Sequence, residues 1–70
     1  MKLGNNLRRC RFEHDEITQE ALAQAIGVTR QTIHSIEKGK FVPSTLLALK
    51  LAAFFNRTVE EVFYLVEEEE

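Results

Sequence analysis

The chain has 70 residues, of which 44% are hydrophobic, enough for one small core and too few for two. Its single cysteine, Cys10, excludes an internal disulfide and the multi-cysteine zinc frameworks. No apolar run is long enough to span a bilayer, and the N-terminal segment lacks the apolar centre of a signal peptide. We therefore expect one cytoplasmic domain, residues 1–66, followed by an acidic tail, residues 67–70.

The formal net charge of −2 is unevenly divided along the chain. Residues 1–58 hold all nine Lys and Arg against five acids, which gives +4, and residues 59–70 hold six glutamates and no base, which gives −6. A mildly basic body favours a polyanionic partner, which the acidic tail would repel. Ordinary solvated surface explains the same charges equally well.

The first two predicted helices are separated by a short polar loop. The first covers about residues 6–13, and the letters HDE at 14–16 break it. Thr18 is a favourable N-cap for the second helix, and Gly27 ends it. The inward faces of these two helices are predicted to consist of Leu7, Cys10, Arg11, Leu22, Ala23 and Ile26.

Two further helices follow, each with its own cap. Thr29 caps the third, whose Ile33 and Ile36 face inward, and Gly39 suits the left-handed turn that ends a helix. Ser44 caps the fourth, which is apolar on nearly every side and is therefore expected to be the central helix of the bundle. Its apolar residues include Leu46, Leu47, Leu49, Ala52, Ala53 and Phe54.

A short fifth helix begins at Thr58, and Glu61 three residues later completes a capping box. The β-branched and aromatic letters FYLVE, residues 63–67, predict a strand that pairs with residues 2–4. The predicted fold class is all-α, a five-helix bundle with a small terminal β element formed by N- and C-terminal strands.

The second and third helices have the spacing of a helix-turn-helix, residues 18–38. Only Gly27 and Val28 precede the Thr29 cap, so the two helices must cross steeply. Such a crossing needs positive φ at the turn, a small residue at the contact and an apolar plug between the helices. Gly27, Ala23 and Val28 meet these needs.

With both isoleucines buried, the third helix presents one polar face, formed by Arg30, Gln31, His34 and Ser35. That face is the one that a DNA major groove would meet. A merely soluble helix surface is the alternative for these four side chains taken alone.

Four segments carry a recognisable pattern: LRRCR in the first helix, TQEALAQAIGVTRQTIHSIEKGK across the next two, PSTLLALKLAAFFN in the fourth and TVEEVF in the fifth. They lie within residues 6–67, and this run resembles the Cro and lambda-repressor type of helix-turn-helix family, also called the xenobiotic-response-element family. The first loop, EHDEI, is one residue longer than usual. The resemblance implies a lambda-repressor-like fold, sequence-specific binding to double-stranded DNA as a homodimer on an inverted-repeat operator, and transcriptional regulation, by analogy repression.

The resemblance also implies roles for individual residues. The helix face would contact bases, since Arg30 can pair with guanine and Gln31 with adenine, with His34 and Ser35 one turn further. Arg11 and Glu37 would form a partly buried ion pair between the first and third helices. The phosphate contacts would come from Gln19, Thr29, Thr32, Lys38 and Lys40. The dimer interface, within residues 58–66, would comprise Val59, Val62, Phe63, Tyr64, Leu65 and Val66.

Other readings of the sequence have weaker support. The cluster His14, Asp15 and Glu16 is expected to be solvated loop rather than a metal site, and Cys10 to be a small core residue. No metal, no cofactor and no enzymatic activity are expected, because no phosphate-binding loop or catalytic set is visible. The rival from another class is an antitoxin or adaptor module whose main partner is a protein. An additional regulatory protein partner is also left open.

Overall fold

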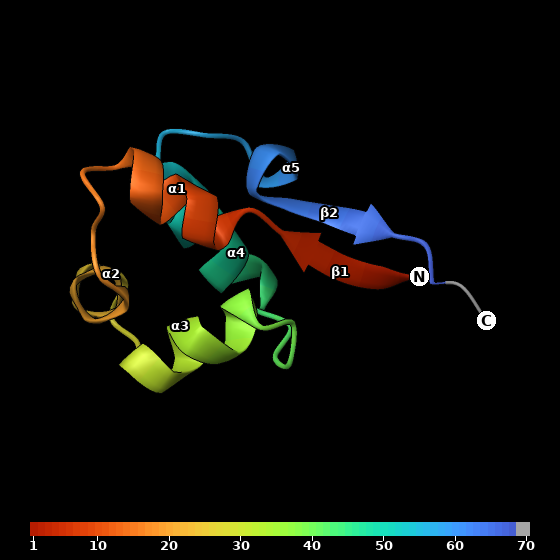
Figure 1. The fold of residues 1–70 in the computed structure, drawn as a ribbon, viewed down its shortest axis with the longest axis horizontal. Helices are drawn as coiled ribbons and strands as arrows, with labels where there is room; N and C mark the ends of the chain where they lie inside the picture. Colours follow the sequence, from red (N-terminus) through yellow and green to blue (C-terminus); the bar gives the residue numbers. More distant parts are fainter. Residues whose placement is uncertain (69–70) are drawn as a thin grey trace.

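The computed structural model describes residues 1–68 as five short helices and a small antiparallel sheet formed by the two chain ends (Figure 1). This architecture confirms the predicted fold class. Of the predicted acidic tail, residues 69–70 lie outside the described part. In chain order the elements are β1 (Lys2–Asn5), α1 (Leu7–Glu13), α2 (Gln19–Ile26), α3 (Arg30–Glu37), α4 (Thr45–Phe54), α5 (Val59–Val62) and β2 (Phe63–Val66).

Side-chain caps start four of the five helices. In each, a hydroxyl oxygen accepts the backbone N–H three residues later, which satisfies a donor that the helix itself leaves free. The predicted capping box is also present, because the Glu61 carboxylate accepts the Thr58 backbone N–H at 2.8 Å. That hydrogen bond lowers the pKa of Glu61. The four caps, all predicted, are Thr18, Thr29, Ser44 and Thr58.

The sheet joins the two ends of the described chain. Gly4 lies opposite Tyr64, with Lys2 opposite Val66. A Cβ atom on Gly4 would lie 2.5 Å from Tyr64 Cε1 and 2.7 Å from Val66 Cγ2, so glycine leaves room for both side chains across β1. The predicted strand pairing is therefore confirmed.

The core takes a contribution from every helix. Six side chains are less than 2% exposed, and α3 contributes two of them, as predicted. At the turn between α2 and α3, Gly27 has a φ of 91° and the Val28 N–H donates to Ala23 O at 3.0 Å. The six buried side chains are Leu7, Leu22, Ile33, Ile36, Leu51 and Val62.

The prediction that α4 is covered on all sides is wrong. Leu51 and Ala52 are buried, but Leu46 and Leu49 are 67% and 51% exposed. Seventy residues do not provide enough chain to cover every side of one helix, so α4 packs on one face. Its outer face leaves apolar surface uncovered.

The first loop contains two consecutive residues in the left-handed region. Asp15 and Glu16 have φ values of 53° and 55°, and the loop is closed where the Ile17 N–H donates to Arg11 O at 3.1 Å. A side chain other than glycine is strained at such φ values.

Glu16→Gly should therefore stabilise the fold. The relief of backbone strain exceeds the extra entropy of glycine in the unfolded chain, so we expect the free energy of unfolding to rise by about 0.5 kcal/mol. Urea denaturation would measure the change. Glu20→Gly, inside α2, is the matched control and should destabilise by about 1 kcal/mol. A loss of stability in Glu16→Gly would contradict the strain argument.

Candidate nucleic-acid interface

The outer face of α3 gathers the predicted base-contacting residues on one surface. Ile33 and Ile36, 0% and 1% exposed, fix the rotation of the helix about its axis. Arg30 and Gln31 are consequently exposed. His34 and Ser35, one turn further, are half-buried, and the Gln31 side-chain amide donates to Ser35 Oγ at 3.3 Å.

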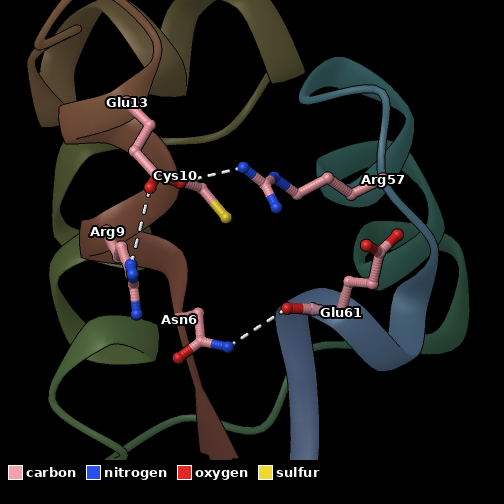
Figure 2. A pocket seen from close by; sticks show the side chains of 6 residues that line it. All are labelled: Asn6, Arg9, Cys10, Glu13, Arg57 and Glu61. Atoms are coloured by element: carbon pink, nitrogen blue, oxygen red, sulfur yellow. Dashed lines mark hydrogen bonds and ion pairs between the residues drawn. The ribbon is translucent and has the colours of Figure 1, made fainter.

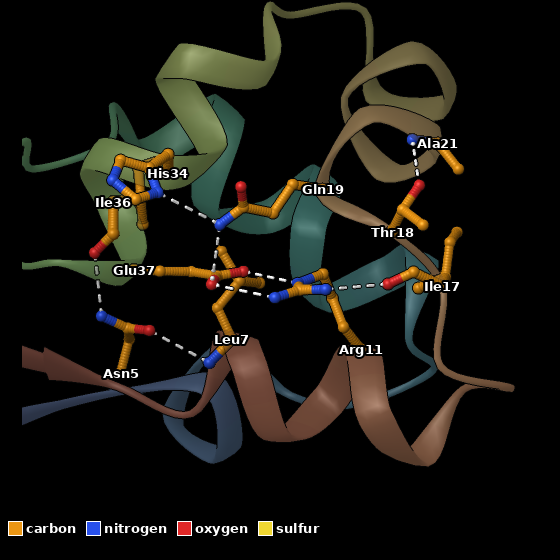
Figure 3. Close-up of polar contacts among 10 residues, drawn as sticks. All are labelled: Asn5, Leu7, Arg11, Ile17, Thr18, Gln19, Ala21, His34, Ile36 and Glu37. Atoms are coloured by element: carbon orange, nitrogen blue, oxygen red, sulfur yellow. Dashed lines mark hydrogen bonds and ion pairs between the residues drawn. The ribbon is translucent and has the colours of Figure 1, made fainter.

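An ion pair anchors the end of α3 to α1 (Figure 3). Arg11 Nε donates to Glu37 Oε2 at 2.6 Å and Nη2 donates to Oε1 at 3.1 Å, a two-point contact. Arg11 Nη1 also donates to Ile17 O at 3.0 Å. The side chains are 17% and 7% exposed, so the contact is shielded from water. The predicted pair is thus present.

Gln19 extends this network toward the helix face. Its side-chain amide donates to Glu37 Oε1 at 3.1 Å and lies 3.4 Å from His34 Nδ1 (Figure 3). The family resemblance implied that Gln19 contacts a phosphate, a role open to its side-chain amide or its backbone amide. Because the side-chain amide is directed inward, the backbone N–H at the start of α2 is the group left for that role.

Asn5 is a structural residue that the sequence analysis missed. Its side-chain amide donates to Ile36 O at 3.0 Å, and its Oδ1 accepts the Leu7 N–H at 3.0 Å (Figure 3). It therefore links β1 to the end of α3 and to the first backbone N–H of α1. No local sequence signal reveals this role, because the partner on α3 is 31 residues away.

The remaining predicted phosphate contacts flank α3. Thr29 Oγ1 accepts the Thr32 N–H, and the two hydroxyls lie 3.0 Å apart at the start of the helix. Lys38 and Lys40 are exposed at its end. Phe41, 47% exposed, was not predicted here, yet it lines a hollow of about 300 Å³ with Gln31, Thr32, Ser35 and Lys40.

Two clusters away from α3 fit no catalytic or metal role. Cys10 is buried beside a pocket of about 160 Å³ (Figure 2). Burial raises the pKa of its thiol. His14 packs its ring against Phe54 and Phe55, with centroid distances of 5.1 and 5.6 Å. Residues 1–68 contain no group of three His, Cys, Asp or Glu side chains able to hold a metal ion.

The predicted dimer-interface residues are divided by the fold. Val62 and Phe63, 0% and 6% exposed, belong to the core of the protomer, although Phe63 also lines a surface hollow with Leu3. Tyr64 and Leu65 are 42% and 70% exposed. Successive strand residues point to opposite faces, so Leu65 lies on the Phe63 side of the sheet, whereas Tyr64 and Val66 lie on the other.

Comparison with known proteins identifies the class. A helix-turn-helix family model matches residues 11–62. The chain is 52% identical over 60 residues to YgzD of Bacillus subtilis, an uncharacterized HTH-type transcriptional regulator, covering 86% of each chain. It is 48% identical over 67 residues to another, MJ0272 of Methanocaldococcus jannaschii, covering 96% of this chain and all of the relative. Control protein C.MunI of a Mycoplasma species is 33% identical over 69 residues, covering 99% of this chain and 93% of the relative.

The chain belongs to the Cro/lambda-repressor-type helix-turn-helix family. It is a DNA-binding transcription regulator and not an enzyme. Among the helices of residues 1–68, none has the length and apolar character needed to cross a membrane.

Proposed function

We propose that the protein binds an inverted-repeat operator as a two-fold homodimer and represses transcription in the cytoplasm, where it meets the chromosome. The main support for the proposal is the exposed face of α3. Arg30 and Gln31 lie on that face, and Ile33 and Ile36 are buried on the opposite side of the helix. A helix of this kind docks in the major groove with its N-terminal residues toward the base edges. Arg30 would pair with guanine and Gln31 with adenine.

The two-fold arrangement follows because one recognition helix contacts only a short stretch of DNA sequence. A single recognition helix contacts about four base pairs, too few to select one site in a genome. Two copies on half-sites about 34 Å apart double the sequence that is read. A dimer on a promoter would exclude other proteins from it, which supports repression.

The dimer surface that we propose lies on the Leu65 side of the sheet. Leu65 pairs with Leu3, which lines a mostly apolar hollow of about 480 Å³ together with Val59 and Leu49. Leu65 and Leu49 are 70% and 51% exposed, so this side of the molecule leaves large apolar side chains in contact with water. Burial of this surface against a second copy would remove it from water.

Selection of bound duplexes from a random DNA pool at near-physiological salt tests the proposal. Wild type should retain inverted repeats with half-sites about ten to eleven base pairs apart. Gln31→Ala should relax the preference for one base pair in each half-site, at a cost of about 1 to 3 kcal/mol of discrimination. Gln24→Ala, an exposed glutamine on α2, is the matched control and should select the wild-type sequences.

The same selection separates the rival function. An antitoxin or adaptor would use the uncovered apolar surface of α4, including Leu46 and Leu49, to bind a different protein. Under that function wild type would retain no sequence preferentially and Gln31→Ala would have no effect. Either result would overturn the operator-binding proposal.

A further inference from the structure

A second pocket beside the recognition face collects positive charge from outside the helix-turn-helix. It has a volume of about 410 Å³ and lies between α1, the start of α2 and one side of α3. Arg8 reaches it from α1, and Arg30 and Lys38 reach it from the two ends of α3. Nothing in the sequence pattern assigns a function to Arg8.

Within residues 1–68 these three cations take part in no ion pair. The ion pairs within residues 1–68 join Arg9 to Glu13, Arg57 to Glu13 and Arg11 to Glu37, and none includes Arg8, Arg30 or Lys38. Three like charges facing one pocket repel one another, so the arrangement is unfavourable until an anion occupies it.

The negatively charged acceptor at this pocket, the Glu37 carboxylate, is already engaged. Both oxygens of Glu37 accept hydrogen bonds from Arg11, and Oε1 accepts another from Gln19. The second N–H of the Gln19 amide is directed at His34 Nδ1, 3.4 Å away. In the neutral ring Nδ1 is then the acceptor, so Nε2 carries the proton and is a donor.

His34 Nε2 points away from Gln19 (Figure 3) and no hydrogen bond within residues 1–68 uses it. The free donors at the pocket are the guanidinium groups of Arg8 and Arg30, the ammonium group of Lys38 and the Nε2–H of His34. They outnumber the acceptors left without a hydrogen bond within residues 1–68, of which Gln19 Oε1 is one. A site with several donors and excess positive charge matches a phosphate oxygen.

We propose that this pocket binds a backbone phosphate of the DNA duplex, with Arg8 supplying a contact from α1 that the helix-turn-helix lacks. The inference rests on the proposed function, because a duplex that meets the face of α3 carries its phosphates past the pocket beside it. The contact positions α3 along the groove without reading bases. Loss of this contact therefore weakens binding equally for all DNA sequences.

Arg8→Ala tests the inference, with Arg9→Ala as the matched control. Both remove one arginine from α1, but Arg9 pairs with Glu13 and lines the Cys10 pocket instead. Arg8→Ala removes one contact in each half-site, so it should weaken dimer binding to the selected duplex about 10- to 25-fold at 150 mM salt and reduce the magnitude of the slope of log affinity against log salt by about 1.8. Arg9→Ala should leave that slope within error of wild type.

A neutral phosphate substitute identifies the contact directly. Methylphosphonates are placed one at a time along the selected duplex, and one position in each half-site should weaken wild type severalfold yet leave Arg8→Ala unaffected. Equal losses in both proteins at every position, or equal salt slopes for Arg8→Ala and Arg9→Ala, would overturn the inference while leaving operator binding intact. Absence of any duplex binding by wild type would overturn the proposed function as well.

A free anion in solution, such as inorganic phosphate, offers the pocket the same oxygen atoms as a DNA phosphate. At matched ionic strength, inorganic phosphate should displace no more duplex than chloride does, because the pocket is open on one side and DNA supplies many simultaneous contacts. Displacement by millimolar inorganic phosphate in wild type, lost in Arg8→Ala, would reassign the pocket to a soluble anion and overturn the inference.

Discussion

Glu37→Ala is expected to lower the free energy of unfolding by about 3 to 4 kcal/mol. The substitution leaves the Arg11 guanidinium, 17% exposed, without its two-point partner and removes an acceptor of the Gln19 amide. A buried ion pair adds little net stability, but a buried charge left without its partner is strongly destabilising. The expected loss is large for that reason. A domain of 70 residues is stable by only about 3 to 10 kcal/mol, so this variant should be close to unfolding at 37 °C.

Thermal denaturation followed by circular dichroism measures the effect, with an expected fall in Tm of about 15 °C or more. Glu13→Ala is the control, because Glu13 also contacts arginines, Arg9 and Arg57, but its side chain is 41% exposed. Exposed pairs contribute at most about 1 kcal/mol. Equal losses in the two variants would show that burial of the Arg11 pair is unimportant.

Removal of both charges should be milder than removal of one. In Arg11→Met/Glu37→Leu no unpaired charge remains, and apolar side chains of similar size occupy the site, so we expect more than half of the lost stability to return. Failure of the double variant to recover would mean that the hydrogen bonds to Ile17 O and Gln19, rather than the unpaired charge, dominate the loss.

The parts of the fold that the sequence predicted well are those determined by residues close together in the sequence. A cap hydroxyl binds a backbone N–H three residues away, so Thr18 and Thr29 could be assigned from sequence. Gly27 could be assigned because only a residue tolerant of positive φ fits so short a turn. The strand pairing across the whole chain was also correct, because apolar β-forming residues had one complementary segment at the other end.

Features that depend on distant residues were missed or misjudged. The inward hydrogen bond of Gln19 depends on where the fold places Glu37 and His34, and the hydrogen bond from Asn5 to Ile36 joins residues 31 positions apart in the sequence. The exposure of Leu46 depends on how many helices the chain has left to cover α4. Local sequence patterns contain no information on distances between residues that are far apart in the chain.

The same limit applies to the proposed interface. The family resemblance assigned the interface to residues 58–66, but it did not separate residues that face the core from those that face solvent. Burial along β2 makes the separation: Phe63 is 6% exposed, whereas Leu65, on the same side of the sheet, is 70% exposed. Leu65 is therefore the residue whose substitution should affect a dimer most and the protomer least.

Leu65→Glu should weaken operator binding by about 100-fold or more while the protomer stays folded. The Leu65 side chain is 70% exposed, so its loss costs the fold little. In a dimer the new carboxylate would be buried against apolar surface without a partner, which favours monomers. A monomer loses the gain from engaging two linked half-sites, about 100- to 10,000-fold.

Sedimentation velocity and duplex titration together test this expectation. At tens of micromolar, wild type should sediment as a dimer and Leu65→Glu as a monomer, yet both should bind a single half-site duplex with equal, weak affinity. Leu46→Glu is the matched control, since Leu46 is 67% exposed on α4 and lies outside the proposed surface. If Leu65→Glu remains dimeric, the dimer forms elsewhere; if wild type is itself monomeric, two-fold operator binding is wrong. Equal half-site binding matters most, because it separates loss of the partner from damage to α3.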